Sequence, residues 1–124
     1  MDDVEAEAAK PGRDPNLGMV EKDGRWWTYD RRTEECHGSP LDEPEPVTAD
    51  LAYLGRHVRD GRTLVHIAGL HATGSLGAAH YLADHVGELY HQVGADESFS
   101  MVIRCELDGQ DISNTSVLVP PSTW

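Results

Sequence analysis

The stretch of sequence that decides the predicted fold is RTLVHIAGLHATGSLGAAHYLADHVGELYHQV, residues 62–93. Its first part, residues 63–69, is a mostly apolar run with the length of a strand buried inside a sheet. Residues 69–77 combine three glycines with hydroxyl groups and a histidine, and an amphipathic helical pattern continues to Val93. In α/β proteins, a strand that leads through a glycine-rich turn into a helix presents backbone N–H groups to a ligand. The stretch therefore predicts where a site lies, but not what it binds.

The rest of the chain supplies further predicted elements. Residues 24–30, which are rich in aromatic side chains, and residues 34–37 predict an N-terminal β-hairpin. A capping threonine and an apolar stripe predict a helix at residues 48–59, ended by the glycine that follows. Residues 98–107 and 116–119 predict two more strands, with a turn between them.

These elements predict an α/β fold, a small Rossmann-like sandwich with an N-terminal β-hairpin. Strand 63–69, helix 75–93 and strand 99–107 are expected to form a parallel β-α-β unit, because a right-handed crossover places two such strands parallel with the helix on one face. The charged residues 1–18 predict a disordered acidic lead-in. Residues 19–124 then form a single α/β domain.

Charge and composition argue against several classes of function. The 124 residues include 22 acidic and 10 basic side chains, and the formal charge of −12 repels nucleic acid and anionic membranes. We therefore expect no direct nucleic-acid partner and no membrane contact. Cys36 and Cys105 lack the spacing of a metal or redox motif, and no signal peptide or long apolar stretch is found. The sequence predicts a cytoplasmic protein with reduced thiols and no cofactor.

The glycine-rich loop holds the candidate ligand site, which we expect to bind a small molecule or an anion through backbone N–H groups. A phosphate-binding loop needs a lysine and a hydroxyl residue after its second glycine, whereas this chain has Ser75 and Leu76 there. The dinucleotide pattern G-x-G-x-x-G is also incomplete. Tight packing of strand against helix is the alternative explanation for the small residues. The candidate ligand-binding residues are Gly69, His71, Thr73, Gly74, Ser75 and Gly77.

A catalytic alternative makes Ser75 the nucleophile of a loose elbow motif, with His71 or His66 as its base. The motif requires glycine where this chain has Thr73, and the later strands supply no complete acid and histidine pair. The absence of a complete catalytic set favours a non-catalytic function. His66 lies among apolar neighbours and has two possible roles. It either makes one hydrogen bond within the sheet or lines the ligand crevice.

Seven histidines raise the question of metal binding. His80, Asp84, Glu88 and His91 share one arc of the predicted helix, and the first two have the i, i+4 spacing of a metal chelate. The opposite arc is apolar and is expected to face the core, which leaves the polar arc in water and predicts no metal site. The residues of the apolar arc are Ala79, Leu82, Ala83, Val86, Leu89, Tyr90 and Val93.

The run VHIAGLHATGSLGAAHYL at residues 65–82, preceded by WTYDRRT at residues 27–33, resembles the C-terminal domain of certain actinobacterial helix-turn-helix transcriptional regulators. The resemblance covers residues 22–124. It implies a sensing or interaction domain, with DNA contact made by a separate module, since this chain carries no helix-turn-helix signal.

The expected function is therefore a non-catalytic ligand-sensing or regulatory binding domain. The first alternative is a protein-interaction or oligomerisation module, a homodimer or the partner of a regulatory protein, which the aromatic hairpin and the long helix suggest. The second alternative is a small serine-dependent hydrolase that uses Ser75 and His71.

Overall fold

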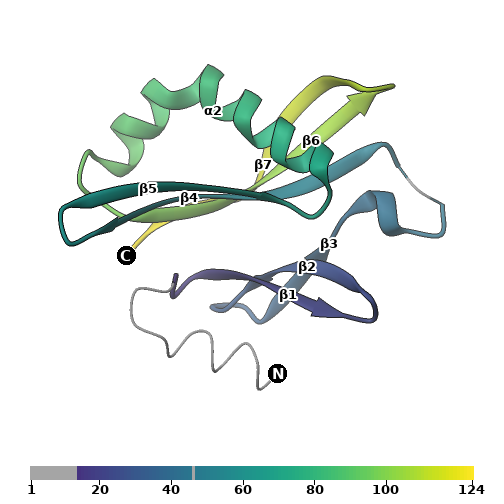
Figure 1. Ribbon diagram of the computed structural model, residues 1–124, viewed down its shortest axis with the longest axis horizontal. Coiled ribbons are helices and arrows are strands. Elements are labelled where there is room, and N and C mark those ends of the chain that lie inside the picture. The colour runs from purple at the N-terminus through teal and green to yellow at the C-terminus, as the bar shows by residue number, and fades with distance from the viewer. Residues whose placement is uncertain (1–13, 46) are drawn as a thin grey trace.

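The computed structural model describes residues 14–45 and 47–124 (Figure 1). Within these residues, seven strands form two antiparallel sheets. The smaller sheet has the order β1-β2-β3 and consists of β1 (Leu17–Lys22), β2 (Arg25–Asp30) and β3 (Glu35–Gly38). The larger has the order β5-β4-β6-β7 and consists of β4 (Ala49–Arg59), β5 (Arg62–Gly69), β6 (Phe99–Asp108) and β7 (Asp111–Thr123). A 3-10 turn, η1 (Pro40–Asp42), and the long helix α2 (Ala72–Val93) complete the fold.

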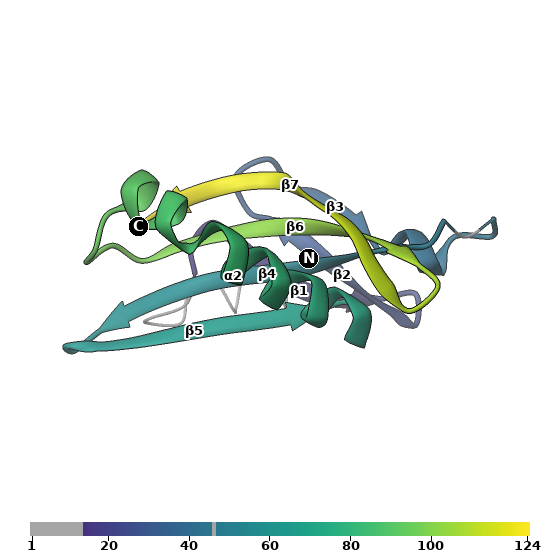
Figure 2. The ribbon, with the colours of Figure 1, turned by 90° about the horizontal axis from the view of Figure 1, so that it is seen from above.

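The elements are stacked in three layers, with α2 on one face of the larger sheet and the smaller sheet on the other (Figures 1 and 2). Alternate side chains of β4 and β6 point to opposite faces, so the larger sheet has an apolar cluster on each side. The cluster under α2 contains Leu54, Tyr81, Leu89, Val93, Phe99, Met101 and Ile103. The cluster between the sheets contains Leu17, Leu51, Tyr53, Leu70, Val102 and Val119.

Asp-Gly pairs make two of the tight turns. Asp23 and Gly24 join β1 to β2, and Asp60 and Gly61 join β4 to β5, with φ between 53° and 74° at these four residues. Positive φ at both central residues is the requirement of a two-residue hairpin turn whose twist matches the strands. The predicted hairpin at residues 24–37 is confirmed as β2 and β3, and the predicted turn between residues 107 and 111 is confirmed between β6 and β7.

The prediction of a Rossmann-like α/β fold with a parallel β-α-β unit is wrong. All strand pairs among the described residues are antiparallel, and β4 lies between β5 and β6, so the two strands expected as parallel neighbours never pair. The predicted helix at residues 48–59 is β4. Its first seven residues are buried on both faces of the sheet, so they show no alternation, and their apolar side chains fit a helical spacing by coincidence.

Two further expectations about residues 62–93 need correction. β5 is an edge strand with exposed residues along most of its length, not a strand covered on both faces. The predicted helix is confirmed as α2, but its apolar arc is divided. Leu82, Leu89 and Val93 pack against the larger sheet, whereas the remaining apolar residues are exposed because that sheet covers a narrower arc of the helix than expected. The exposed members are Ala79, Ala83, Val86 and Tyr90.

The predicted lead-in lies mostly outside the described residues, which begin at Asp14. Asp14 and Leu17 are 5% and 1% exposed, so the packed part of the chain starts earlier than residue 19. Among the described residues, no helix has the length and apolar character needed to cross a membrane.

Candidate functional site

The structure brings the six candidate residues of the glycine-rich loop together at the junction of β5 and α2. Gly69 is the last residue of β5, and His71 directly precedes α2. The other four lie in the first turns of the helix, where Gly74 and Gly77 are buried. The hydroxyl oxygen of Ser75 accepts a hydrogen bond from the N–H of Gly69 at 2.7 Å, which ties the start of the helix to the end of the strand.

A carboxylate of the chain itself lies where the sequence places a bound anion. Asp50 of β4 is fully buried, and its Oδ2 accepts hydrogen bonds from the N–H groups of His71 at 3.0 Å and Gly74 at 2.7 Å and from the Thr73 hydroxyl at 3.2 Å. Its Oδ1 accepts two more, from the hydroxyl of Ser39 at 2.6 Å and from the next backbone N–H at 2.9 Å. The N–H groups and dipole of a helix start favour such an anion. These donors are engaged by Asp50.

Close packing continues one turn further along α2. A Cβ atom on Gly77 would overlap Cβ and Sγ of Cys105 on β6, so the helix can approach the sheet only because residue 77 has no side chain. Burial, together with the nearby charge of Asp50, raises the pKa of the Cys105 thiol. The thiol therefore stays protonated and is a poor nucleophile at neutral pH.

The two residues of the hydrolase hypothesis have different partners. Ser75 accepts from Gly69, as described above, while Nε2 of His71 lies 2.7 Å from Oδ1 of Asp42 at the surface. No hydrogen bond joins Ser75 to His71 within the described part of the chain.

The histidines of the polar arc, His80 and His91, are exposed, as the sequence predicts. Nδ1 of His80 lies 3.5 Å from Oδ2 of Asp84, and both side chains are more than half exposed. Residues 14–45 and 47–124 contain no group of three or more His, Cys, Asp or Glu side chains that could hold a metal ion. Cys36 and Cys105 are both unbridged.

A cleft of about 1180 Å³ lies on the other face of the larger sheet, between the β4–β5 hairpin and β1. Its wall mixes apolar, aromatic and charged side chains, which is the usual composition of a small-molecule site. The residues of the wall come from both sheets. They are Asp14, Leu17, Gly18, Met19, Arg31, Tyr53, His57, Val58, Arg59, Asp60, Arg62, Leu64, His66, Ala68, Ser98 and Trp124.

A chain of polar and aromatic contacts crosses this wall. The Tyr53 hydroxyl donates to Oδ2 of Asp14 at 2.8 Å and lies 2.7 Å from Nε2 of His57. Since the one hydroxyl proton goes to Asp14, Nε2 of His57 must carry the proton of the second bond. The His57 ring lies 4.4 Å from the His66 ring and meets the Trp124 ring edge-on at 5.0 Å.

Gly55 allows Tyr53 to take this position. Tyr53 and His57 project from the same face of β4, and the tyrosine ring lies across the glycine between them. A Cβ atom at residue 55 would lie 2.6 Å from the Tyr53 hydroxyl oxygen. Burial, followed by the charge of Asp14 and the hydrogen bond to it, raises the pKa of Tyr53 well above its ordinary value. Tyr53 is therefore neutral at physiological pH.

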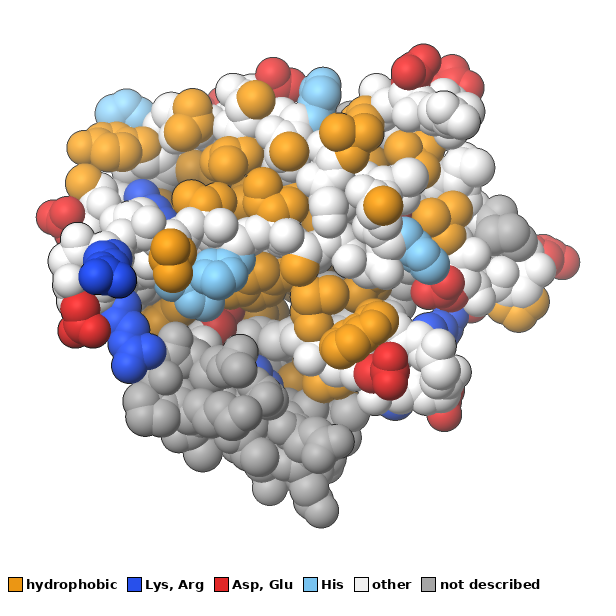
Figure 3. Space-filling model, in the orientation of Figure 1, with side chains coloured by type: hydrophobic (Ala, Val, Ile, Leu, Met, Phe, Trp, Pro, Cys, Tyr) orange, Lys and Arg blue, Asp and Glu red, His pale blue; other side chains and the backbone are white. Residues whose placement is uncertain are grey.

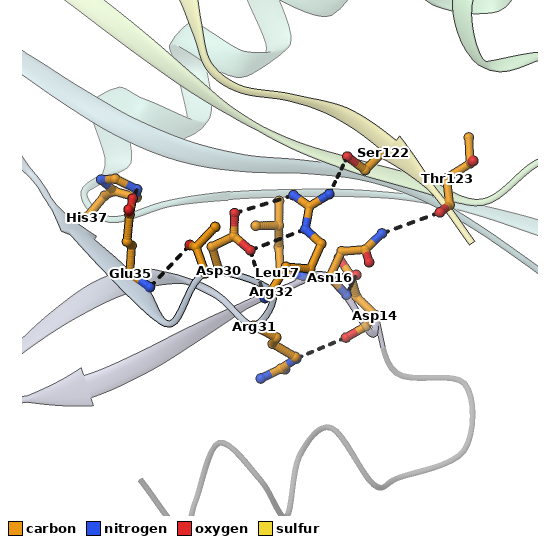
Figure 4. A network of polar contacts seen from close by, with 11 residues as sticks. Asp14, Asn16, Leu17, Asp30, Arg31, Arg32, Glu35, His37, Ser122 and Thr123 are labelled. Carbon is orange, nitrogen blue, oxygen red and sulfur yellow. Dashed lines mark hydrogen bonds and ion pairs between the residues drawn. The ribbon is translucent and has the colours of Figure 1, made fainter.

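Polar contacts fix the turn between β2 and β3 to the end of β7, beside the cleft (Figure 4). Arg32 donates from Nη1 to the Ser122 hydroxyl at 2.6 Å and binds the carboxylate of Asp30. Burial alone would raise the pKa of Asp30, but the hydrogen bonds and charge of Arg32 outweigh it, and the pKa is lowered. Arg31 donates from Nε to the backbone oxygen of Asp14 at 3.1 Å. These contacts hold the two sheets together where the cleft opens.

The charge of the cleft wall is opposite to that of the chain. Among the described residues, the wall includes three arginines and two histidines but only two aspartates, although the whole chain has 22 acidic and 10 basic residues. Asp14 accepts hydrogen bonds from Tyr53 and from two backbone N–H groups, and Asp60 lies 3.8 Å from Arg59. Both carboxylates therefore have partners of their own.

Comparisons of the chain with models of known protein families, with curated proteins and with solved structures found no match. The resemblance to helix-turn-helix regulators therefore stays a prediction, and the site has to be interpreted from its own chemistry.

Sequence reasoning missed Tyr53, His57 and Trp124. Of the two histidines that it considered for one crevice, His66 lines the cleft, whereas His71 lies beside Asp42 at the start of α2. Tyr53 and His57 reach His66 only because residues 48–59 form a strand that pairs with β5, with Gly55 opposite His66. The sequence did contain a signal for the pairing of β4 with β5. Asp60-Gly61 flanked by two strand-forming runs is a strong hairpin signal, and it predicts β4 and β5 as paired neighbours.

Proposed function

We propose that this chain is a non-catalytic ligand-binding domain whose site is the cleft between the two sheets. The observation that carries the proposal is the concentration of arginine and histidine on the cleft wall of a strongly acidic chain. A local reversal of charge against the overall field attracts anionic ligands to this one surface.

The chemistry of the wall defines the ligand class. Arg62 supplies a guanidinium group, which suits a carboxylate. His66 and Trp124 supply ring faces, and Leu64 and Ala68 supply apolar surface. A small molecule with a flat apolar body and one carboxylate matches all three features. We place the carboxylate toward Arg62 and the flat body against the rings.

The polar groups of the cleft favour binding over catalysis. Tyr53 gives its proton to Asp14, and its raised pKa keeps it neutral, so it is not a general base near pH 7. Within residues 14–45 and 47–124, the cleft wall contains no cysteine and no serine paired with a histidine. Ser98, the one serine of the wall, donates instead to the backbone oxygen of Val58.

The regulatory part of the proposal rests on the resemblance described above. A ligand domain of a transcriptional regulator would convert occupancy of the cleft into a change in its partner module. A cytoplasmic location fits such a role, and the two unbridged cysteines are consistent with a reducing compartment.

Pairs of aromatic carboxylates and their neutral amides test the proposal. We expect the carboxylates to raise the melting temperature and to shift backbone NMR signals of β4, β5 and Trp124, and the amides to do so more weakly. His66→Ala and Arg62→Gln should remove the response. His80→Ala is the matched control, since it deletes an exposed histidine on the far face of α2 and should leave the response intact.

Two outcomes contradict the proposal. Equal responses to acids and amides would remove the anionic part of the ligand definition. Shifts confined to residues 69–77, retained in His66→Ala, would return the site to the glycine-rich loop.

A further inference from the structure

The edge strand β5 exposes apolar side chains on both of its faces. Leu64 is 59% exposed on the cleft face, and Val65 is 56% exposed on the face that carries α2. A lone edge strand normally limits its apolar surface, because its unpaired backbone groups invite pairing with another chain. These two residues therefore mark an edge that is suited to a partner.

The backbone of β5 offers a regular set of hydrogen-bonding groups along this edge. In a two-residue hairpin, the pair next to the turn, here Arg59 and Arg62, exchanges hydrogen bonds, and such pairs alternate along the strands. The N–H and C=O groups of Thr63, Val65 and Ile67 therefore point outward. No hydrogen bond from these groups to another element is found within residues 14–45 and 47–124.

The opposite edge of the same sheet is protected. β7 has register shifts against β6 and carries Pro120 and Pro121. Proline removes a backbone donor, and bulges turn an edge away from a partner. β5 contains no proline and pairs with β4 in one unbroken register. Of the two edges, β5 is the one that remains open.

A stripe of exposed apolar residues runs along the outer surface of α2. Its members recur at alternating intervals of three and four residues, the spacing of a helix–helix contact. Leu76 and Ala79, at the start of the stripe, lie beside Gln110, Asp111 and Ile112 at the β6–β7 turn. The stripe therefore does not extend the β5 edge, and a contact at that edge depends on β5 itself. Figure 3, drawn with the β5 edge toward the viewer, shows hydrophobic side chains gathered over α2. The stripe consists of Leu76, Ala79, Ala83, Val86 and Tyr90.

The charge distribution selects the partner. Two copies of a chain with charge −12 repel each other at most surfaces, but β5 contains no acidic residue. A two-fold axis at Val65 aligns all three outward-facing residues of both copies, with Thr63 opposite Ile67. In this register Arg62 lies opposite Ala68 and His66 opposite Leu64. No two like charges are directly opposed, which is the requirement for stable cross-strand pairs.

We propose that a second copy of this chain docks on the β5 edge in antiparallel register about Val65. The two larger sheets join into one continuous sheet that carries the two α2 helices on the same face. The occupant is thus a second copy, and a homodimer is the expected assembly.

Sedimentation velocity at high micromolar concentration provides the first test. We expect wild type to sediment with twice the chain mass of 13.6 kDa. Val65→Pro removes an outward N–H without breaking a bond to β4, and Val65→Lys places two like charges opposite each other at the two-fold axis. Each should raise the dissociation constant roughly tenfold or more. Leu118→Lys, at a residue 40% exposed on β7, is the matched control and should have no effect.

Cross-linking provides the second test, and it needs no stable dimer. Residue 65 lies opposite itself across the axis at a Cα separation of about 5.5 Å, within the ~4.4–6.8 Å that a disulfide spans. In a Cys36→Ser background, Val65→Cys should form a covalent dimer on mild oxidation, whereas Leu118→Cys should stay monomeric. A monomeric wild type together with equal cross-linking of both variants overturns the proposal. A dimer that Val65→Pro leaves intact overturns it as well.

Discussion

The start of α2 and the cleft between the sheets both gather polar groups beside an apolar cluster, but they use them in opposite ways. At the start of α2, the Asp50 carboxylate is fully buried and is bound by Ser39, Thr73 and backbone N–H groups. In the cleft, the ring of His66 and the guanidinium of Arg62 face a space of about 1180 Å³. A glycine-rich turn between a strand and a helix is therefore not by itself evidence of a bound ligand. A carboxylate from elsewhere in the chain can satisfy its donors.

The largest expected effect comes from removing that carboxylate. Asp50→Ala leaves buried hydroxyl and N–H donors without an acceptor, and we expect it to lower the free energy of unfolding by about 3 kcal/mol or more. Asp50→Asn, which keeps one acceptor oxygen, should cost less. Urea denaturation measures both. The control is Asp42→Ala, whose partner His71 is 43% exposed, and which should cost less than ~1 kcal/mol. Equal losses for Asp50→Ala and Asp42→Ala would show that the start of α2 does not depend on Asp50.

Two glycines of the same helix test how closely the loop is packed. Gly77→Ala forces a methyl group against Cys105, and we expect a loss of about 1–3 kcal/mol. Gly87→Ala meets no atom within 4 Å and should stabilise the helix by up to about 1 kcal/mol, since alanine is the better helix former. Thermal unfolding of the two variants therefore shifts in opposite directions. A stabilising Gly77→Ala would mean that α2 lies further from β6 than described.

Tyr53 connects stability in the cleft to alkaline pH. Its pKa is raised in the folded state by burial and by Asp14, so its contribution is complete below the pKa of an unfolded tyrosine, about 10, and is lost as pH rises above that value. Tyr53→Phe should cost about 1 kcal/mol at pH 7 through the lost hydrogen bonds. The same variant should show a shallower decline of stability above pH 10. Tyr90→Phe, at an exposed tyrosine, is the control and should leave the alkaline slope unchanged.

The smallest expected effects separate the two regions most cleanly. His66→Ala and His71→Ala both remove partly solvated histidines, and each should change stability by no more than about 0.5 kcal/mol. Only His66→Ala should abolish the response to aromatic carboxylates. If His71→Ala abolishes the response and His66→Ala does not, the roles assigned to the two regions are reversed.

Local patterns were sufficient for the elements whose environment is simple. The aromatic run at residues 25–30 predicts β2. The apolar spacing to Val93 predicts α2, because one face of this helix lies on a core and the other in water. β4 has no such contrast, because its first seven residues are buried on both faces. Asp50 illustrates the error well. In the predicted helix at residues 48–59 it would be an acidic residue of the first turn. In the structure it lies in β4, and its carboxylate accepts hydrogen bonds from the start of α2 instead.

The cleft could not be predicted for the same reason. His66 was identified as unusual in the sequence, but its neighbour His57 comes from β4, and Trp124, whose ring meets that of His57, is the residue after β7. Their approach depends on the order of strands in the sheet, which local periodicity does not determine. Once residues 48–59 are assigned as a strand that ends at the Asp60-Gly61 turn, the register alone brings Gly55 opposite His66.

The buried Asp50 carboxylate also determines the order in which the chain can fold. The N–H group of Gly74 finds its acceptor 24 residues earlier in the chain, so the first turn of α2 gains that bond only after β4 has reached its place. We expect the β4–β5 hairpin to belong to the folding nucleus and the start of α2 to form late. Substitutions at Thr73 should then accelerate unfolding without slowing folding, which stopped-flow kinetics can measure. A peptide that contains α2 but lacks β4 should fray from its first turn.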